Sequence, residues 1–269
     1  MSYGSKATGR LAGKTILITG ASAGIGEATA IEYASAAKGE LKLILTARRL
    51  EKLDSLKSKL EAEFPNIKVL TVKLDVSDLS AIEKFFKELP KEFSDVDVLI
   101  NNAGLAKGFA NVGEISQNDL DCMFNTNVIG NIAMVQHLLP LFKKKNSGDI
   151  VQLGSVASRE SYPGGAIYCA TKQALRAFTS ALRKESINTK IRIIEIQPGS
   201  VDTEFSDVRF YGDKVASKKL NEGIEQLSAD DIAEMIVFFT SRKQNTVVAE
   251  SLILPTCQAS RSHTYRHSK

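Results

Sequence analysis

Three residues of this chain have side chains that can hold or move a proton: Ser155, Tyr168 thirteen residues later, and Lys172 four residues after that. Tyr168 and Lys172 are four residues apart, so in a helix a phenol and an ammonium would share one face. A free tyrosine has a pKa of about 10, which must fall to about 7 for proton exchange near neutrality. One ammonium achieves this only where water is excluded, and more readily beside a second positive charge. The spacing therefore predicts an acid/base pair inside a cleft.

The elements around these residues can be predicted from their apolar patterns. The run Ile150–Leu153 predicts a buried strand that ends just before Ser155, and the residues from Ile167 onward predict a helix that carries Tyr168. Short apolar runs recur along the chain: Thr15–Ile18, Leu41–Leu45, Val69–Val72, Val96–Ile100, Ile191–Ile196 and Ser251–Leu254. Helical patterns such as Leu50–Leu56 and Phe178–Ile187 separate them. This alternation predicts an α/β fold, a single-domain Rossmann-type doubly wound sheet of seven parallel strands with helices on both faces.

The whole chain, residues 1–269, is expected to form one domain with a core over about 14–254 and a flexible polar tail over 255–269. The formal net charge is only +4, and Lys143–Lys145 fit a solvated helix end, so a nucleic-acid surface is not indicated. The three cysteines and three histidines give neither a disulfide pattern nor metal-ligand spacing, so no metal is expected. No apolar run is long enough to cross a bilayer and the N-terminus lacks a signal peptide, which indicates a cytoplasmic protein without a membrane partner.

A glycine-rich segment directly follows the first predicted strand. Gly20, Gly24 and Gly26, with Ser22, Ala23 and Ile25 between them, precede a helical pattern. Glycines at such a junction allow a tight turn and a close approach of the backbone to a pyrophosphate at a helix N-terminus. The position of the segment predicts a dinucleotide-binding turn.

The end of the second predicted strand bears on which dinucleotide is bound. No carboxylate is present there to hold a ribose 2′-hydroxyl, and Arg48 and Arg49 follow Ala47 directly. Two arginines at a helix start oppose the helix dipole, a cost that a 2′-phosphate would offset. NADP(H) is therefore favoured over NAD(H).

Three further strand ends predict cofactor contacts. Asp75 and Val76 could meet the adenine, although Asp75 could equally cap the helix that begins near Ser77 or Asp78. The residues that follow the fourth and sixth predicted strands have small side chains or backbone groups that could approach the cofactor. They are Asn102, Ala103, Gly104, Pro198, Gly199, Val201 and Thr203. Strand ends of this kind bind ligands in open α/β sheets.

With these motifs in this order, the chain resembles the short-chain dehydrogenase/reductase family over about residues 14–254. The stretches Leu45–Arg49 and Tyr162–Lys172 most resemble the branch of NADP-dependent 3-hydroxy acid dehydrogenases, which act on serine, allo-threonine and 3-hydroxy acids, with fungal members that reduce many ketones. The resemblance implies that Tyr168 is the proton donor in reduction, that Lys172 depresses the Tyr168 pKa and holds the nicotinamide ribose, and that Ser155 bonds the carbonyl oxygen. It further implies a homotetramer, and a water-positioning role for Asn127, which could instead bond at a helix kink.

Two segments are predicted to form the substrate wall, the one that precedes Tyr168 and a flap after the sixth predicted strand. This wall is expected to comprise Ser155, Tyr168, Arg159, Tyr162, Gly164, Gly165, Phe205 and Tyr211, the last two from a flap over 200–223. A carboxylate substrate needs a cation, for which Arg159 and Arg209 are the candidates; alternatively both are surface residues bonded to acids. Gly164 and Gly165 would also suit a bulky ketone. The expected activity is NADP(H)-dependent interconversion of a secondary alcohol and a carbonyl. The alternatives are a reductase for bulky ketones and keto esters, or a non-catalytic NADP-binding regulator.

Overall fold

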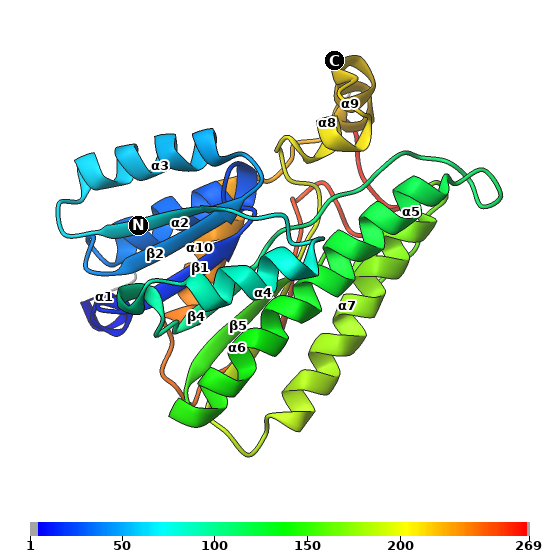
Figure 1. The fold of residues 1–269 in the computed structure, drawn as a ribbon. Coiled ribbons are helices and arrows are strands. Elements are labelled where there is room, and N and C mark those ends of the chain that lie inside the picture. The colour runs from blue at the N-terminus through cyan, green and yellow to red at the C-terminus, as the bar shows by residue number, and fades with distance from the viewer. Residues whose placement is uncertain (1–4, 268–269) are drawn as a thin grey trace.

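A computed structural model describes residues 5–267 of the chain and contains one sheet of seven parallel strands. The strand order is β3-β2-β1-β4-β5-β6-β7. β2 and β3 are added on one side of β1, and the chain then crosses back to add β4 to β7 on the other side (Figure 1). The strands are β1 (Thr15–Thr19), β2 (Lys42–Ala47), β3 (Lys68–Lys73), β4 (Val98–Asn101), β5 (Gly148–Leu153), β6 (Ile191–Pro198) and β7 (Glu250–Ile253). Each of the seven predicted strands is therefore present, with ends that shift by up to two residues.

Helices cover both faces of the sheet, as the sequence predicted (Figure 1). One face packs α2 (Gly24–Ala36), α3 (Leu50–Glu63) and α10 (Ala229–Thr240). The other packs α4 (Leu79–Glu88), α6 (Asn131–Lys145) and α7 (Ala166–Glu185). The remaining helical segments are α1 (Ser5–Leu11), η1 (Lys91–Phe93), α5 (Gln117–Phe124), η2 (Asn125–Gly130), η3 (Val156–Ser158), α8 (Phe205–Arg209) and α9 (Lys214–Asn221).

The core follows from the strand sequences. Because side chains alternate between faces, a strand covered on both faces is apolar at successive positions. Ile16 and Ile18 of β1 pack with the α2–α3–α10 face, whereas Leu17 packs with the α4–α6–α7 face.

One ion pair is buried at the base of the sheet. The Arg192 guanidinium on β6 donates from Nε to Oδ1 of Asp149 on β5 at 2.6 Å and from Nη2 to Oδ2 at 2.5 Å. It also donates from Nη2 to the Thr240 carbonyl at the end of α10, at 2.7 Å. This pair therefore fixes α10 to the amino-terminal ends of two central strands.

The C-terminal segment differs from the expectation of a flexible tail. Within its described part, Gln258 is buried and its Oε1 accepts the Ser200 N–H at 2.9 Å. Farther along, Arg266 donates to the Leu220 carbonyl at 2.9 Å and the His267 N–H to the Gly223 carbonyl at 2.8 Å. The segment from 255 to 267 therefore packs along the flap over 200–223, and Figure 1 shows the end of the chain beside α9. Separately, no helix within residues 5–267 is both long enough and apolar enough to cross a membrane.

Candidate active site

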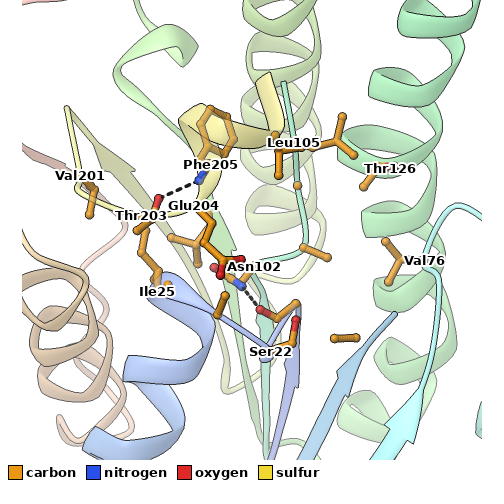
Figure 2. A pocket seen from close by; sticks show the side chains of 18 of the residues that line it. Ser22, Ile25, Val76, Asn102, Leu105, Thr126, Val201, Thr203, Glu204 and Phe205 are labelled. Atoms are coloured by element: carbon orange, nitrogen blue, oxygen red, sulfur yellow. Dashed lines mark hydrogen bonds between the residues drawn. The ribbon is translucent and has the colours of Figure 1, made fainter. Parts of the chain in front are cut away.

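A cavity of about 380 Å³ opens at the carboxyl ends of the strands. It lies near β1 and β4, which are neighbours in the sheet although β2 and β3 separate them in the chain. Loops that follow β1, β2, β3, β4, β5 and β6 contribute to its wall. Figure 2 shows Val76 and Thr126 on one side of this cavity, facing Val201, Thr203 and Phe205 on the other. The location is where open α/β sheets bind ligands. Every predicted cofactor residue lines this cavity except Gly26.

The glycine-rich turn is built by backbone requirements. Gly20 and Gly24 have φ of +67° and +57°, a region that side chains other than glycine rarely adopt. Gly26 lies behind the turn, where a Cβ would come within 2.4 Å of the Gly20 carbonyl oxygen. Asn102 fixes the turn from β4, since its Nδ2 donates to the Thr19 carbonyl at 2.8 Å. The free N–H groups at the start of α2 therefore open onto the cavity.

Arg49 lies at the start of α3, at the end of the cavity nearest β2. Its guanidinium donates to the Ser22 Oγ at 3.2 Å and pairs with Glu204 at 2.7 Å. Lys52 pairs with the same carboxylate at 2.8 Å. Arg48 also lines the cavity, and within residues 5–267 it forms no hydrogen bond or ion pair. Two arginines and a serine hydroxyl thus surround a space into which one flap carboxylate reaches.

Asp75 and Asp78 have separate tasks at the end of β3. Asp78 is the N-cap of α4 and accepts the N–H groups of Ser80 and Ala81. Asp75 lines the cavity and accepts the Ser77 N–H at 2.9 Å, which closes the turn. The suggestion that Asp75 caps the helix is therefore wrong, because Asp78 does so.

The residues of the acid/base pattern meet at the wall of the cavity. β5 ends at Leu153, and Ser155 follows as the N-cap of η3, which turns its hydroxyl toward α7. Tyr168 is on the first turn of α7, and the Ser155 side chain is close enough to its hydroxyl to lower the Tyr168 pKa. Lys172, one turn later, donates from Nζ to the Leu153 carbonyl at 2.6 Å. The ammonium lies 5.9 Å from the centre of the Tyr168 ring.

The electrostatics of this pair differ in part from the expectation. Desolvation raises the pKa of the Tyr168 hydroxyl well above its ordinary value; the Ser155 side chain opposes this without reversing it. Burial lowers the Lys172 pKa to about 8, against an opposing effect of the Glu195 charge. The protein groups alone therefore keep Tyr168 as a neutral phenol, which is the form that can donate a proton. These protein groups therefore do not produce the predicted fall in the Tyr168 pKa, because desolvation outweighs the effects that lower it.

Asn127 is fully buried and does not line the cavity. Its Oδ1 accepts the Leu105 N–H at 2.8 Å, and its Nδ2 donates to the Leu105 carbonyl at 2.8 Å and to the Thr171 Oγ1 at 3.1 Å. It belongs to η2, a π-helical turn between α5 and α6. The side chain therefore ties the loop after β4 to α7, which matches the structural alternative for this residue.

The predicted substrate wall is only partly assembled. Phe205 lines the cavity, with its ring centre 5.6 Å from that of Tyr168. Tyr211 does not line it: the side chain is 62% exposed and donates to Asp119 of α5 at 2.6 Å. Arg159 also lies elsewhere, because its guanidinium bonds Gln197 and pairs with Glu250 at 3.3 Å. The acid-bonded alternative therefore holds for Arg159.

The two glycines expected beside Tyr168 leave no room for a bulky ligand. A Cβ on Gly165 would meet the Tyr162 ring at 2.2 Å, and one on Gly164 would meet the Phe109 carbonyl oxygen at 2.8 Å. Both glycines line a minor space of about 20 Å³ beside Tyr168, and neither lines the main cavity. Protein atoms therefore occupy the volume that these glycines release.

Arg209 is a buried cation at the same place. It is 4% exposed, stacks 3.5 Å from the centre of the Phe109 ring and donates to the Tyr162 hydroxyl at 2.8 Å. Its other partners are the carbonyl oxygens of Gly108 and Gly164, both at 3.1 Å. Within residues 5–267 no carboxylate pairs with it. Arg209 therefore brings an uncompensated positive charge next to Tyr168, whose electrostatics it influences.

Several residues of the cavity wall were missed by sequence reasoning. They are Ala47, Leu74, Leu105, Thr126, Leu153, Gly154, Glu204 and Val208. Most are small or apolar and carry no chemical signal of their own. Glu204 could have been found, because it follows Thr203 directly within the flap.

Comparisons with known proteins agree with this geometry. The chain is 52% identical over 257 residues to an NADP-dependent 3-hydroxy acid dehydrogenase of Schizosaccharomyces pombe, covering 96% of this chain and 98% of that protein. It is 38% identical to a serine 3-dehydrogenase of Agrobacterium fabrum, covering 91% and 95%. The closed form of a serine dehydrogenase complexed with NADP+ superposes with a TM-score of 0.86 at 33% identity, over 95% of this chain and all of that one. The family described as short chain dehydrogenase matches residues 14–212, and the chain belongs to that family.

Proposed function

We propose that this protein is an NADP(H)-dependent oxidoreductase that interconverts 3-hydroxy acids, such as serine, allo-threonine or 3-hydroxybutyrate, with the corresponding carbonyl compounds. The observation that carries the proposal is the meeting of Ser155, Tyr168 and Lys172 in the wall of a cavity that begins at a dinucleotide-type turn. The similar proteins are dehydrogenases of 3-hydroxy acids and serine, which supports this substrate class.

The cavity residues fit NADP(H). The start of α2, with Gly20 and Gly24, would hold the pyrophosphate, and Asp75 and Val76 would meet the adenine. Arg48, Arg49 and Ser22 would hold the 2′-phosphate through charge-assisted hydrogen bonds. Asn102–Gly104, together with Pro198, Gly199, Val201 and Thr203, would line the nicotinamide end. When bound, the dinucleotide supplies or accepts the hydride, and the protein supplies alignment and protons.

The catalytic roles follow from the site. In reduction Tyr168, held as a neutral phenol, donates its proton to the carbonyl oxygen of the substrate. The Ser155 hydroxyl donates a hydrogen bond to the same oxygen as negative charge develops. Lys172 stabilises the tyrosinate that remains, since an adjacent ammonium favours the charged form. In oxidation the same groups act in reverse, with Tyr168 as the base. Asn127 would support a water-mediated proton path near Lys172.

Arg209 supplies the reason for preferring a carboxylate substrate. A buried cation without an anionic partner is costly unless a ligand compensates it. Its guanidinium lies against Tyr162, whose hydroxyl it bonds, at the minor space beside Tyr168. The minor space of about 20 Å³ is too small for a whole substrate, so only its carboxylate would point toward Arg209 while the rest of the acid lies in the main cavity, which Tyr168 also lines. The substrate wall would then comprise Arg209, Tyr162, Ser155, Tyr168 and Phe205.

A substrate panel with both cofactors tests the proposal. Serine, allo-threonine and 3-hydroxybutyrate should be oxidised with NADP+ at higher kcat/KM than with NAD+, and β-keto esters should be reduced more slowly than the matching β-keto acids. Turnover of neutral aryl ketones alone would contradict the substrate class. The assembly proposed for the enzyme, on its family resemblance, is a cytoplasmic homotetramer.

A further inference from the structure

A row of buried polar side chains crosses the sheet beneath the Tyr168–Lys172 pair. Asn101 on β4, Gln152 on β5 and Glu195 on β6 are register partners, and each is at most 1% exposed. Residues two positions earlier on these strands, Leu99, Ile150 and Ile193, belong to the apolar cluster under α4, α6 and α7. Since alternate residues share a face, the polar row lies on that same face, on the side of α7. On this face of the sheet, the apolar residues of β4, β5 and β6 are thus followed, toward the active site, by a row of buried polar residues.

This polar row is incompletely bonded within residues 5–267. Glu195 Oε1 accepts from Gln197 Nε2 at 2.8 Å, but its Oε2 has no partner there. Gln152 has no partner at either end of its amide, and neither has the Oδ1 of Asn101. Such buried atoms are rare in native proteins, and a catalytic role is one of the reasons for which they occur. The carboxyl group of Glu195 is therefore held on one side only.

Glu195 also differs in its ion pairing from its neighbour on the next strand. Glu250, its register partner on β7, forms ion pairs with Arg159, Arg176 and Arg183. Glu195 forms no ion pair within the described part of the chain. From the β5 side it faces only the uncharged amide of Gln152, and from its own strand that of Gln197.

The cations that act on Glu195 come from α7. Lys172 and Arg176 are one helical turn apart, so they share the face that covers β6 and β7. Burial raises the Glu195 pKa, with a further rise from the Glu250 charge, whereas Arg176 and Lys172 lower it. Conversely, the Glu195 charge raises the Lys172 pKa, the one charge effect that opposes burial there.

The two groups approach one another at a single peptide unit. Lys172 Nζ bonds the Leu153 carbonyl at 2.6 Å, and a Cβ on the next residue, Gly154, would lie 2.7 Å from Glu195 Oε1. Glycine at 154 therefore lets the carboxylate come close to the peptide that anchors the ammonium.

We propose that Glu195 is a positioning residue that acts through Lys172, its carboxylate holding that side chain as an ammonium during turnover. The inference rests on the proposed function, because it needs Lys172 to support Tyr168. Glu195 touches neither substrate nor dinucleotide, since it does not line the cavity. Its effect is electrostatic: a nearby negative charge favours the protonated amine against desolvation.

The pH dependence of ketone reduction at saturating NADPH tests this. Reduction should fall on the alkaline side as Lys172 loses its proton, near its pKa of about 8. Glu195→Gln keeps the size and polarity of the side chain but removes the charge, so this alkaline limb should move to lower pH by about one unit. Glu195→Asp keeps the charge, and its limb should stay close to that of the wild type. A purely structural role would lower kcat in both variants without separating their limbs.

Coincident limbs for the wild type and Glu195→Gln would overturn the proposal, and so would equal shifts in the Gln and Asp variants. If circular dichroism shows that Glu195→Gln does not fold, Glu195→Asn compared with Glu195→Asp gives the same contrast at a shorter length. In this comparison, an alkaline limb that moves to lower pH only in Glu195→Asn supports the proposal. Alkaline limbs at the same pH in Glu195→Asn and Glu195→Asp refute it. Failure of the wild-type enzyme to reduce ketones at any pH would instead refute the proposed function.

Discussion

At the scale of single residues, the positions with the strongest chemical demands are those that the sequence located best. Ser155, Tyr168 and Lys172 meet because Ser155 begins the short 3₁₀ turn after β5, and the first two turns of α7 contribute Tyr168 and Lys172. Their pKa values could not be predicted, since desolvation dominates both and depends on the whole surrounding fold. Arg159 and Arg209 show the same limit, because nothing local distinguishes the arginine paired with Glu250 from the one buried beside Tyr168.

Replacing Arg209 by glutamine should separate acids from their esters. The variant loses the charge proposed to hold a carboxylate, so kcat/KM for 3-hydroxybutyrate should fall roughly 30- to 150-fold, from hydrogen bonds to a charged group worth about 2–3 kcal/mol. The value for the methyl ester should fall far less. Arg209→Lys, which keeps a positive charge, is the control and should recover part of the acid activity. Equal losses for acid and ester would show that Arg209 only supports the fold.

The arginines at the start of α3 should set cofactor preference. Arg48→Ala should weaken NADPH binding at least tenfold and leave NADH binding nearly unchanged, because only NADPH carries the 2′-phosphate. Glu204→Gln should act in the opposite direction, since it removes the carboxylate that now pairs with Arg49 and Lys52. Fluorescence titration with both cofactors measures these effects. An NADPH/NADH ratio that does not change in Arg48→Ala would remove Arg48 from the phosphate site.

At the scale of elements, the strands were predictable because parallel strands buried on both faces are short and continuously apolar. The π-helical turn at Asn125–Gly130 was not, since it depends on side-chain bonds between Asn127, the loop after β4 and α7. The C-terminal segment was mistaken for a free tail because it is polar. Its polar groups bond instead to the flap, through residues more than forty positions away in the chain.

The buried pair at the base of β5 and β6 should dominate local stability. Asp149→Asn leaves the Arg192 guanidinium buried without its counter-charge, so the free energy of unfolding should fall by about 3–5 kcal/mol. Asp95→Asn is the matched control, because this carboxylate pairs with Lys145 at the surface and is 79% exposed. The control should change stability by less than about 1 kcal/mol. Urea unfolding of both variants measures the difference, and equal losses would contradict the distinct role of the buried pair.

At the scale of the whole molecule, one arrangement connects the fold to its chemistry. The sheet gathers its loops at one edge, the turn after β1 marks one end of the cavity, and α7 places Tyr168 and Lys172 in its wall. The segment over 200–223 lies over the same cavity, and the C-terminal segment holds it in place. The seven parallel strands and the order of the motifs along the chain could be read from the sequence. The side chains that choose the substrate could not, because they come from loops whose contacts span the chain.

The proton donor is the central element of this account, and Tyr168→Phe tests it most directly. In a single turnover with NADPH and a β-keto acid, the variant should reduce the ketone at least about 100-fold more slowly, the lower bound for loss of a general acid. Its dissociation constant for NADPH should stay within about twofold of the wild type, since the ring remains in place. A variant that binds NADPH normally and reduces the ketone at the wild-type rate would contradict the assignment of Tyr168 as the donor.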